Sequence, residues 1–480
     1  MIHLLASSNT YNMEIAFHGA AQTVTGSKHL VTLKSGVKIL LDCGMFQGMG
    51  ENTDEMNEYF GFAPAEVTYL VLSHAHIDHC GLIPRLVAQG FKGPIFCTAA
   101  TMDLVRILLM DSAKIQEQDT EYGNKHRIRK GLPLLKPLYT DEDVLTAMRL
   151  FKIVDYNTDQ QIDSNISVLF TDAGHIVGSA AVHLSILEDG KQTRITFSGD
   201  IGRYDDMLLK SPQTFPQSDF ILLESTYGDS LHKDEEPTEG QLLQIIRETC
   251  MVKHGKLIIP AFSVGRTQEI LYALNSMDLD GTLPDVPFYV DSPLSEKATQ
   301  VLRDHENVFN EEVKKVLKLD SDVFQFTGLK FIQTVEESKA LNDDPRPCVI
   351  ISASGMAEAG RVKHHIKNTI SNAKNTILMV GYCEPNSLGG RLLAGKKEVS
   401  IYAEEYRVNA DIRSIKSMSA HGDYDDLLRF LSCQDPAKVK KLFLVHGELD
   451  VQTNFREKIL AKGFENVLIP ERHQRESLSL

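Results

Sequence analysis

The chain has 480 residues, of which 42 % are hydrophobic and 24 % charged, as is typical of a globular protein with several domains. This composition excludes a disordered, collagen-like or coiled-coil chain, and no apolar run is long enough to predict a membrane span. The net charge of −15 means that binding to a polyanion would depend on local basic patches. Seven scattered cysteines without a CxxC pair, and an N-terminus without a signal peptide, predict a cytoplasmic protein.

In chain order, the first part of the sequence predicts short strands and two helices. The strands are expected at Met13–Ala16, His29–Leu33, Val37–Asp42 and Val67–Ser73, and the helices at Gly81–Gln89 and Ala99–Gln118. The next segment, Glu121–Pro137, follows the second helix and is rich in charge, Gly and Pro. It carries a basic cluster made of Lys125, His126, Arg127, Arg129 and Lys130.

The middle of the chain has a different pattern, in which strands alternate with helices. Phe220–Leu223 precedes a helix near Gln241–His254, and the strand Leu257–Pro260 leads into the helix Gly265–Leu274. Strands that alternate with helices of this length predict a parallel sheet. We therefore expect two α/β layers with an insertion in the middle.

The strongest chemical signal is Ser-His-Ala-His-Ile-Asp-His, from Ser73 to His79, at the end of an apolar strand and before a helix. In an extended segment, residues two apart point the same way, so His74 and His76 can converge on one ion. Where the chain turns into the helix, Asp78 and His79 point to the other side and can reach a second ion. Imidazole and carboxylate together suit Zn²⁺, with Mn²⁺ or Fe²⁺ as harder substitutes.

Three further side chains that can bind metal each follow directly after a predicted strand: His175, Asp200 and His446. A carboxylate in such a place could bridge two ions. Asp42 also ends an apolar strand and would suit a role behind the ligands, where it holds a histidine N–H. Singly, a strand-end aspartate is more often a turn former or a helix cap. In this order after the histidine motif, however, these residues predict one shared site.

The order of these motifs resembles that of the metallo-β-lactamase superfamily, more specifically its β-CASP nuclease branch, close to relatives of the eukaryotic pre-mRNA 3′-end endonuclease. The segments that carry the resemblance are Leu223–Gly228, Pro260–Arg266, Ser352–Met356, Ser419–Asp423 and Val445–Glu448. It implies an α/β fold, with an αββα sandwich built from residues 1–220 and 391–480. Residues 221–390 would form an inserted β-CASP domain, a parallel sheet flanked by helices.

The resemblance also assigns roles to residues. It makes His74, His76 and His175 ligands of one Zn²⁺, and Asp78, His79 and His446 ligands of another, with Asp200 as the bridge. It further marks Glu224 and His421 as motif residues, and a histidine at position 446 is typical of RNA-acting members. Two ions about 3.5–4 Å apart can hold a hydroxide and clamp a phosphate. His421, oriented by Glu224, is then the expected general acid.

Substrate contacts are expected from the insertion. Ser263 and Arg266 lie between a strand and a helix, where backbone N–H groups can receive phosphate. Arg361 and Lys363 place positive charge at the start of another helix. A loop that only turns the chain would also explain the first pair, and a solvated helix face would also explain the second.

The sequence therefore predicts a zinc-dependent ribonuclease that cleaves single-stranded RNA internally, with a 5′–3′ exonuclease activity left open. A dinuclear-zinc hydrolase of a small ester or thioester, a DNA nuclease and an RNA-binding scaffold with structural zinc are the alternatives. No membrane partner is expected, and a homodimer is left open.

Overall fold

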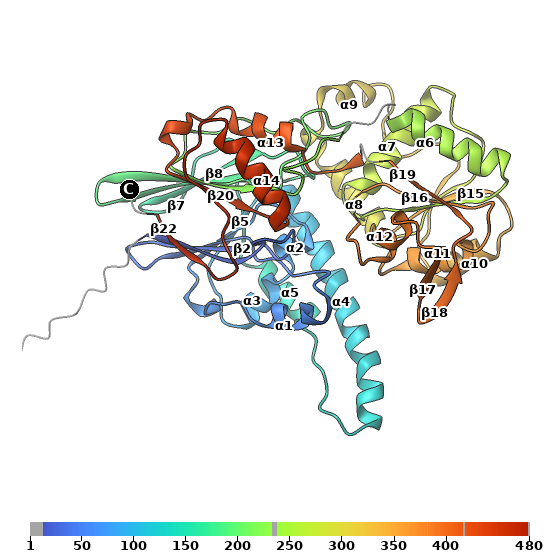
Figure 1. Cartoon of the computed structure of the whole chain (residues 1–480), viewed down its shortest axis with the longest axis horizontal. Coiled ribbons are helices and arrows are strands. Elements are labelled where there is room, and N and C mark those ends of the chain that lie inside the picture. The colour runs from blue at the N-terminus through green and yellow to red at the C-terminus, as the bar shows by residue number, and fades with distance from the viewer. Residues whose placement is uncertain (1–12, 233–237, 382, 416–417, 479–480) are drawn as a thin grey trace, which may run out of the picture.

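The computed structural model describes residues 13–232, 238–381, 383–415 and 418–478. Two seven-stranded sheets and one six-stranded sheet account for most of the strands. The two larger sheets lie together in one part of the molecule, and the smaller sheet with its helices forms a separate lobe beside them (Figure 1). No helix in the described part of the chain combines the length and apolarity needed to cross a membrane.

The first sheet begins with antiparallel strands and continues with parallel ones. Its order is β22 (Arg475–Ser477), β1 (Glu14–Gly19), β2 (Lys28–Thr32), β3 (Lys38–Leu41), β4 (Tyr69–Val71), β5 (Ile95–Cys97) and β6 (Phe151–Ile153). Its outer face packs on α2 (Ile77–Cys80), α3 (Ile83–Ala88), α4 (Ala99–Arg129) and α5 (Asp141–Met148). The short helix α1 (Thr53–Glu58) lies in the connection from β3 to β4.

The second sheet contains the strand that precedes His446 and the strand that ends at Glu224. Its order is β21 (Val467–Leu468), β20 (Lys441–Val445), β11 (Phe220–Glu224), β10 (Lys191–Phe197), β9 (Ala180–Glu188), β8 (Ile166–Asp172) and β7 (Gln160–Asp163). Its outer face packs on α13 (Tyr424–Leu431) and α14 (Leu449–Leu460). Val31 and Val71 of the first sheet share a buried core with Phe197 and Leu222 of the second. The expected αββα sandwich is confirmed.

The inserted lobe is built on a fully parallel sheet. Its order is β14 (Leu329–Phe331), β13 (Phe288–Val290), β15 (Cys348–Ser352), β12 (Lys256–Pro260), β16 (Thr376–Met379) and β19 (Asp411–Ser414). One face packs on α11 (Arg361–Thr369) and α12 (Leu388–Leu393), and the other on α6 (Thr238–Ile246), α7 (Arg266–Leu279) and α8 (Pro293–Asp304). Such strands are buried on both faces, which explains their continuous apolar runs. The expected parallel sheet between helices is confirmed.

The remaining elements of the lobe lie at its periphery. They are α9 (Glu311–Val316), α10 (Val335–Asp343) and the hairpin of β17 (Glu398–Ile401) and β18 (Glu404–Arg407). Sheet membership divides the chain differently from the expected domain limits. β11, which starts at Phe220, pairs with β10 and β20 of the sandwich, whereas β19 beyond residue 390 completes the sheet of the lobe.

Helix α4 is longer than the sequence suggests. The expected end at Gln118 is wrong, because the helix continues to Arg129 and includes most of the basic cluster that was expected to follow it. Gly123 is tolerated within the helix, an i,i+4 ion pair joins Glu121 and Lys125, and no proline interrupts the chain before Pro133.

Candidate metal centre

The histidine motif sits where β4 gives way to α2. His76 has extended backbone angles and is the N-cap of α2, so the chain turns between His76 and Asp78. This turn packs tightly on the loop after β3, since a Cβ atom at Gly44 would lie 1.6 Å from the Asp78 carbonyl oxygen. A glycine is therefore required at position 44 for the motif to adopt this position.

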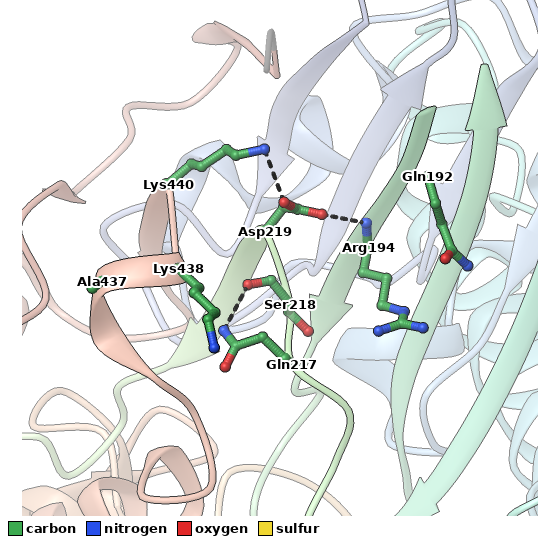
Figure 2. A pocket seen from close by; sticks show the side chains of 8 residues that line it. All are labelled: Gln192, Arg194, Gln217, Ser218, Asp219, Ala437, Lys438 and Lys440. Atoms are coloured by element: carbon green, nitrogen blue, oxygen red, sulfur yellow. Dashed lines mark hydrogen bonds and ion pairs between the residues drawn. The ribbon is translucent and has the colours of Figure 1, made fainter. Parts of the chain in front are cut away.

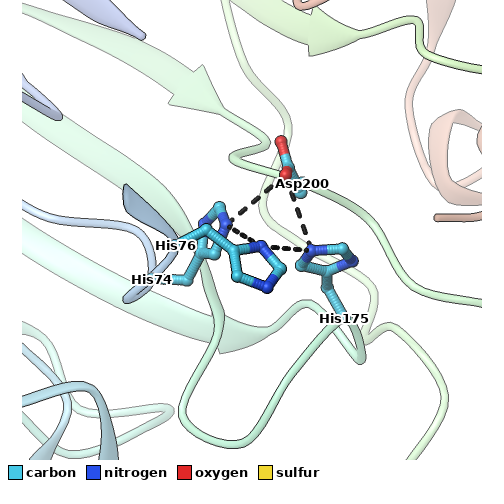
Figure 3. A group of neighbouring side chains, drawn as sticks. All are labelled: His74, His76, His175 and Asp200. Atoms are coloured by element: carbon cyan, nitrogen blue, oxygen red, sulfur yellow. Dashed lines mark hydrogen bonds and ion pairs between the residues drawn. The ribbon is translucent and has the colours of Figure 1, made fainter. Parts of the chain in front are cut away.

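The first group of candidate ligands converges on one point (Figure 3). The His76 Nδ1 atom lies 3.2 Å from His74 Nε2 and 3.1 Å from His175 Nε2. Asp200 Oδ2 lies 3.4 Å from His74 Nε2 and 3.5 Å from His175 Nε2. Ligands of a tetrahedral ion with bonds of about 2.0–2.1 Å are about 3.3–3.4 Å apart. These four side chains therefore have the spacing that a zinc ion requires.

The second group lies on the other side of Asp200. His446 Nε2 is 3.4 Å from Asp78 Oδ2, and His79 Nε2 is 3.8 Å from the same oxygen. The second carboxylate oxygen of Asp200, Oδ1, is 3.3 Å from His79 Nε2 and 3.6 Å from His446 Nδ1. Asp200 thus directs one oxygen to each group, which is the arrangement of a bridging ligand.

The buried atoms of the two groups fit a metal cation. His79 Nε2 and Asp200 Oδ1 are buried, and neither makes a well-formed hydrogen bond within the described residues. Burial lowers the pKa of His74 to about 3 and that of His76 to about 4, so both rings are neutral and can donate lone pairs. Burial would also lower the pKa of His79, but the Asp200 and Asp78 carboxylates raise it well above its usual value. Positive charge is therefore favoured at a place where ligand atoms are unpaired.

A hydrogen-bonded support lies behind the ligands. Asp42 Oδ2 lies 2.6 Å from His79 Nδ1, which leaves Nε2 to face Asp200. The Ser73 N–H and hydroxyl each donate to the Asp42 carboxylate at 2.8 Å. Asp42 and His446 have positive φ angles of 58° and 50°, a strained conformation for residues other than glycine that is frequent at functional sites.

The structure also brings His421 and Glu224 together beside the ligands. Glu224 ends β11 and is fully buried; its Oε1 accepts a hydrogen bond from the Ile201 N–H at 2.6 Å. The His421 Nδ1 atom lies 3.2 and 3.3 Å from the two Glu224 oxygens, and its ring centre is 4.5 Å from that of His175. Burial would lower the pKa of His421, but the Glu224 and Asp200 carboxylates raise it to about 9. His421 is therefore held beside the candidate ligands, with the protonated form of its ring favoured.

Two supporting residues were not identified from the sequence. The Thr226 hydroxyl donates to Glu224 Oε2 at 2.7 Å and lies 3.0 Å from His446 Nδ1, so it links the buried glutamate to a candidate ligand. His232 Nε2 lies 3.1 Å from the His421 carbonyl oxygen. Thr226 stands inside the Leu223–Gly228 motif, which was the available signal, whereas His232 lies outside every motif.

The loop after β12, in the inserted lobe, lies against a residue next to a candidate ligand. A Cβ atom at Gly265 would lie 3.3 Å from the side chain of Ile176, the residue that follows His175. Ser263 in this loop is half-buried, with its hydroxyl 3.3 Å from that of Ser292. Arg266, by contrast, is buried and forms an ion pair with Glu269.

An aromatic side chain in the same loop was also missed. Phe262 is 40 % exposed although it belongs to a chemical motif. Its ring lies against Gly355 of the loop after β15, where a Cβ atom would approach within 2.6 Å. The Phe262 carbonyl oxygen accepts hydrogen bonds from the Thr267 N–H and hydroxyl. Phe262 therefore presents an exposed apolar ring on a loop that packs against the neighbour of His175.

The other two expected substrate contacts lie at the start of α11. Arg361 donates to Asp291 Oδ1 at 2.6 Å and to the Ile332 and Gln333 carbonyl oxygens. Lys363 lies 5.2 Å from the centre of the Tyr402 ring and donates to the Glu358 carbonyl oxygen. The charge of Arg361 is thus already balanced within the lobe.

A separate surface hollow of about 410 Å³ lies at the other end of the second sheet (Figure 2). Its walls include Ser218 and Asp219, just before β11, and Lys440, just before β20. Glu224 and the candidate ligand His446 lie at the opposite ends of these two parallel strands. The hollow is therefore separate from the metal centre.

Comparison with known families identifies three segments. Residues 29–232 match the metallo-β-lactamase superfamily, residues 267–392 match the β-CASP domain, and residues 405–470 match a Zn-dependent metallo-hydrolase RNA specificity domain. Together these segments contain all seven candidate ligands. The six from His74 to Asp200 fall in the first segment, and His446 falls in the last.

Curated proteins with similar sequences span nearly the whole chain. Ribonuclease TTHA0252 of Thermus thermophilus is 35 % identical over 94 % of this chain and 95 % of its own. An RNase J-like protein of Methanocaldococcus jannaschii is 33 % identical over 90 % of this chain and 92 % of its own. Cleavage and polyadenylation specificity factor 73 of Drosophila melanogaster is 28 % identical over 90 % of this chain and 59 % of its own.

A solved structure shares the fold. The crystal structure of a protein of unknown function from Enterococcus faecalis V583 aligns with 98 % of this chain and all of that chain, with a TM-score of 0.52 and 13 % identity. At this level of identity, the similarity supports the arrangement of the sheets and says nothing of the reaction.

Proposed function

The chain belongs to the β-CASP branch of the metallo-β-lactamase superfamily and is a metal-dependent hydrolase; from this premise we propose that it cleaves single-stranded RNA internally. The observation that carries the proposal is the joint position of Asp200 and His421. Asp200 lies between two groups of candidate ligands, and His421, backed by Glu224, faces the same space. A metal-dependent phosphodiesterase can use the metal centre to activate water and a nearby proton donor to protonate the departing oxygen.

We propose that the site holds two Zn²⁺ ions, with Mn²⁺ or Fe²⁺ as substitutes. His74, His76 and His175 would hold one ion, Asp78, His79 and His446 the other, and Asp200 both. Bound there, the ions supply Lewis acidity toward a phosphate and lower the pKa of a water molecule toward neutrality. Asp42 fixes the tautomer of His79 and keeps its Nε2 directed to the site.

His421 is the proposed general acid. Its Nδ1 faces the Glu224 carboxylate, so the proton that it can give away is the one on Nε2. The carboxylate keeps the ring protonated at neutral pH, and the Thr226 hydroxyl holds the same carboxylate in place. His421 can therefore protonate the 3′-oxygen that leaves when the phosphodiester bond breaks.

The inserted lobe supplies the substrate contacts. We propose that Phe262 stacks on a base and that the Ser263 hydroxyl contacts a phosphate, because both lie on the loop that packs against Ile176, the residue after His175. Lys363 adds positive charge at the start of α11. Arg266 and Arg361, which are paired with Glu269 and Asp291, would act on RNA by holding these loops in place.

The alternative activities make different demands on the same residues. Hydrolysis of a small ester or thioester requires neither the inserted lobe nor His421. A DNA nuclease would use the same dinuclear site, and the histidine at position 446 favours RNA through family resemblance. The RNA specificity segment at residues 405–470 and the ribonuclease name of the Thermus relative also support RNA.

The test is cleavage of end-labelled single-stranded RNA, beside DNA of the same sequence, by zinc-loaded protein and its Asp200→Ala variant. We expect internal fragments from RNA only, absent with the variant. A ladder that starts at the 5′ end would instead assign exonuclease polarity. If zinc-loaded protein cleaves neither strand but hydrolyses a thioester, the proposed function is wrong. Mass measurement in solution shows whether the protein is a monomer or a homodimer, which the sequence leaves open.

A further inference from the structure

The distal part of α4 and the segment that follows it form a projection from the sandwich, which we call the arm (residues 114–137). Ala113 is the last buried residue of α4, and no residue of the arm is buried. From Lys114 to Arg129 the helix extends about 24 Å at 1.5 Å per residue. Figure 1 shows this part of α4 pointing away from the body of the molecule, with the chain returning beside it.

The tip of the arm (residues 122–137) is held together by specific contacts between α4 and the returning chain. The Asn124 side chain accepts a hydrogen bond from the Leu135 N–H and donates one to the Leu135 carbonyl oxygen. Arg127 Nε donates to the Pro133 carbonyl oxygen at 2.6 Å, and Gly123 leaves space for the Leu135 side chain, which lies 3.5 Å from a Cβ built there. A helix without tertiary support is marginal in water, so these contacts stabilise an element that has no role in the core.

The tip carries positive charge that is not balanced locally. Residues 122–137 contain five lysines and arginines and no aspartate or glutamate: Lys125, Arg127, Arg129, Lys130 and Lys136. Within the described chain, no carboxylate lies at ion-pair distance from the last three. At the hollow of Figure 2, by contrast, Lys440 lies 2.9 Å from Asp219. In a chain with a net charge of −15, the tip is a site that attracts a polyanion.

The exposed side chains beside these cations also suit RNA. Tyr122 is 79 % exposed and Ile128 is 65 % exposed, so neither is used in packing. Proteins that bind single-stranded nucleic acid combine cations along the backbone with aromatic rings on which bases stack. We propose that the arm binds single-stranded RNA at a distance from the metal centre and retains long substrates. This inference rests on the proposed function, because it assigns a second contact to the same RNA.

The test compares long and short RNA with a charge-reversal variant, Arg129→Glu with Lys130→Glu and Lys136→Glu. The short RNA is chosen so that it can occupy the metal centre without reaching the arm. For long RNA we expect the KM to rise about tenfold or more, and the slope of log affinity against log salt to fall by about 2, since each contact contributes about 0.7. The ratio of long-RNA to short-RNA KM is the readout. A matched control reverses Lys374, Lys396 and Lys397, which are also exposed, and should leave this ratio unchanged.

A second pair of variants tests the tyrosine. Tyr122→Ala should weaken long-RNA binding, and Tyr122→Phe should retain it, because the ring alone is needed for stacking. If wild-type protein cleaves short RNA and the charge-reversal variant binds long RNA normally, the inference is wrong and the proposed function stands. It is equally wrong if the variant instead loses binding to vesicles with anionic lipid or changes its mass in solution. If wild-type protein neither binds nor cleaves RNA, the proposed function itself fails.

Discussion

Two buried clusters of aspartate and histidine lie at strand ends in this molecule, and they use their polar atoms differently. At the metal centre, histidine nitrogens converge on one another and on Asp200, and two buried ligand atoms lack a hydrogen bond of good geometry. In the inserted lobe, Asp291 follows β13 and receives hydrogen bonds from His365, Ser338 and Arg361. The unpaired atoms of the first cluster fit a bound cation, whereas Asp291 of the second cluster already has hydrogen-bond partners from the protein.

The charges of the second cluster are matched within it. Burial would raise the pKa of Asp291, but the hydrogen bonds from His365, Ser338 and Arg361 lower it below its usual value. The other nitrogen of His365 lies 2.9 Å from Asn342 Oδ1. Residue type at a strand end therefore does not distinguish a ligand site from a structural network. Between these two clusters, the unpaired buried atoms of His79 and Asp200 make the distinction, because an unsatisfied polar group is costly unless something binds to it.

The largest effect is expected from Asp200→Ala. Loss of the shared carboxylate should remove bound metal and lower RNA cleavage by about a thousandfold or more, since metal-ion catalysis is worth several kcal/mol and each 1.36 kcal/mol is a factor of ten. Elemental analysis and single-turnover cleavage measure the two effects. Asp291→Ala is the matched control, and it should lower stability while the folded fraction keeps its metal. Equal metal loss in both variants would remove the distinction between the clusters.

His421→Ala should lower cleavage by about 100-fold to 10,000-fold, the range of general acid catalysis, without loss of metal. The acid must be protonated, so activity should fall as the pH rises through the raised pKa of His421. Glu224→Gln removes the charge that raises this pKa and should shift the alkaline limb of the kcat profile to lower pH. A limb that stays in place in Glu224→Gln would show that His421 does not control it.

Asp42→Asn tests the support behind the ligands. An amide cannot match the charge of the carboxylate that lies 2.6 Å from His79 Nδ1, so the orientation and basicity of the ring should suffer. We expect metal affinity to fall about 10-fold to 100-fold, as measured by competition with a chelator. Ser73→Ala, which removes one of two Ser73 hydrogen bonds to Asp42, should have a smaller effect in the same direction. Unchanged affinity in Asp42→Asn would limit Asp42 to a turn-forming role.

Much of the fold was predictable because its signals are local. Apolar strands such as Lys441–Val445 end in polar motif residues, and the strand–helix alternation after Phe220 predicts the parallel sheet that is observed. The extent of α4 was not predictable from composition, since charge and Gly in residues 121–131 are compatible with either a loop or an exposed helix. The place of β19 in the sheet of the lobe depends on pairing with β16, a contact between distant segments.

For the candidate site, the sequence predicts which residues gather and fails to predict how each is used. The spacing of the histidine motif and the strand-end positions of His175 and Asp200 already imply convergence, as the structure shows. The partners of Arg266 and Arg361 are Glu269 and Asp291, and the second of these pairs joins residues 70 positions apart in the chain. A basic residue in a motif loop therefore looks the same in the sequence whether it binds substrate or an internal carboxylate.

Arg361→Gln gives the smallest expected effect and sharpens the comparison from the side of the second cluster. The variant leaves Asp291 without one charged partner and the Ile332 and Gln333 carbonyl oxygens without a guanidinium donor. Unfolding free energy should fall by about 1–3 kcal/mol, the usual cost of a buried group left unsatisfied, as measured by urea denaturation. The KM for RNA should change by less than about twofold, because the guanidinium is already engaged. A large rise in KM at unchanged stability would mean that Arg361 releases Asp291 to bind RNA, and the second cluster would then belong to the substrate site.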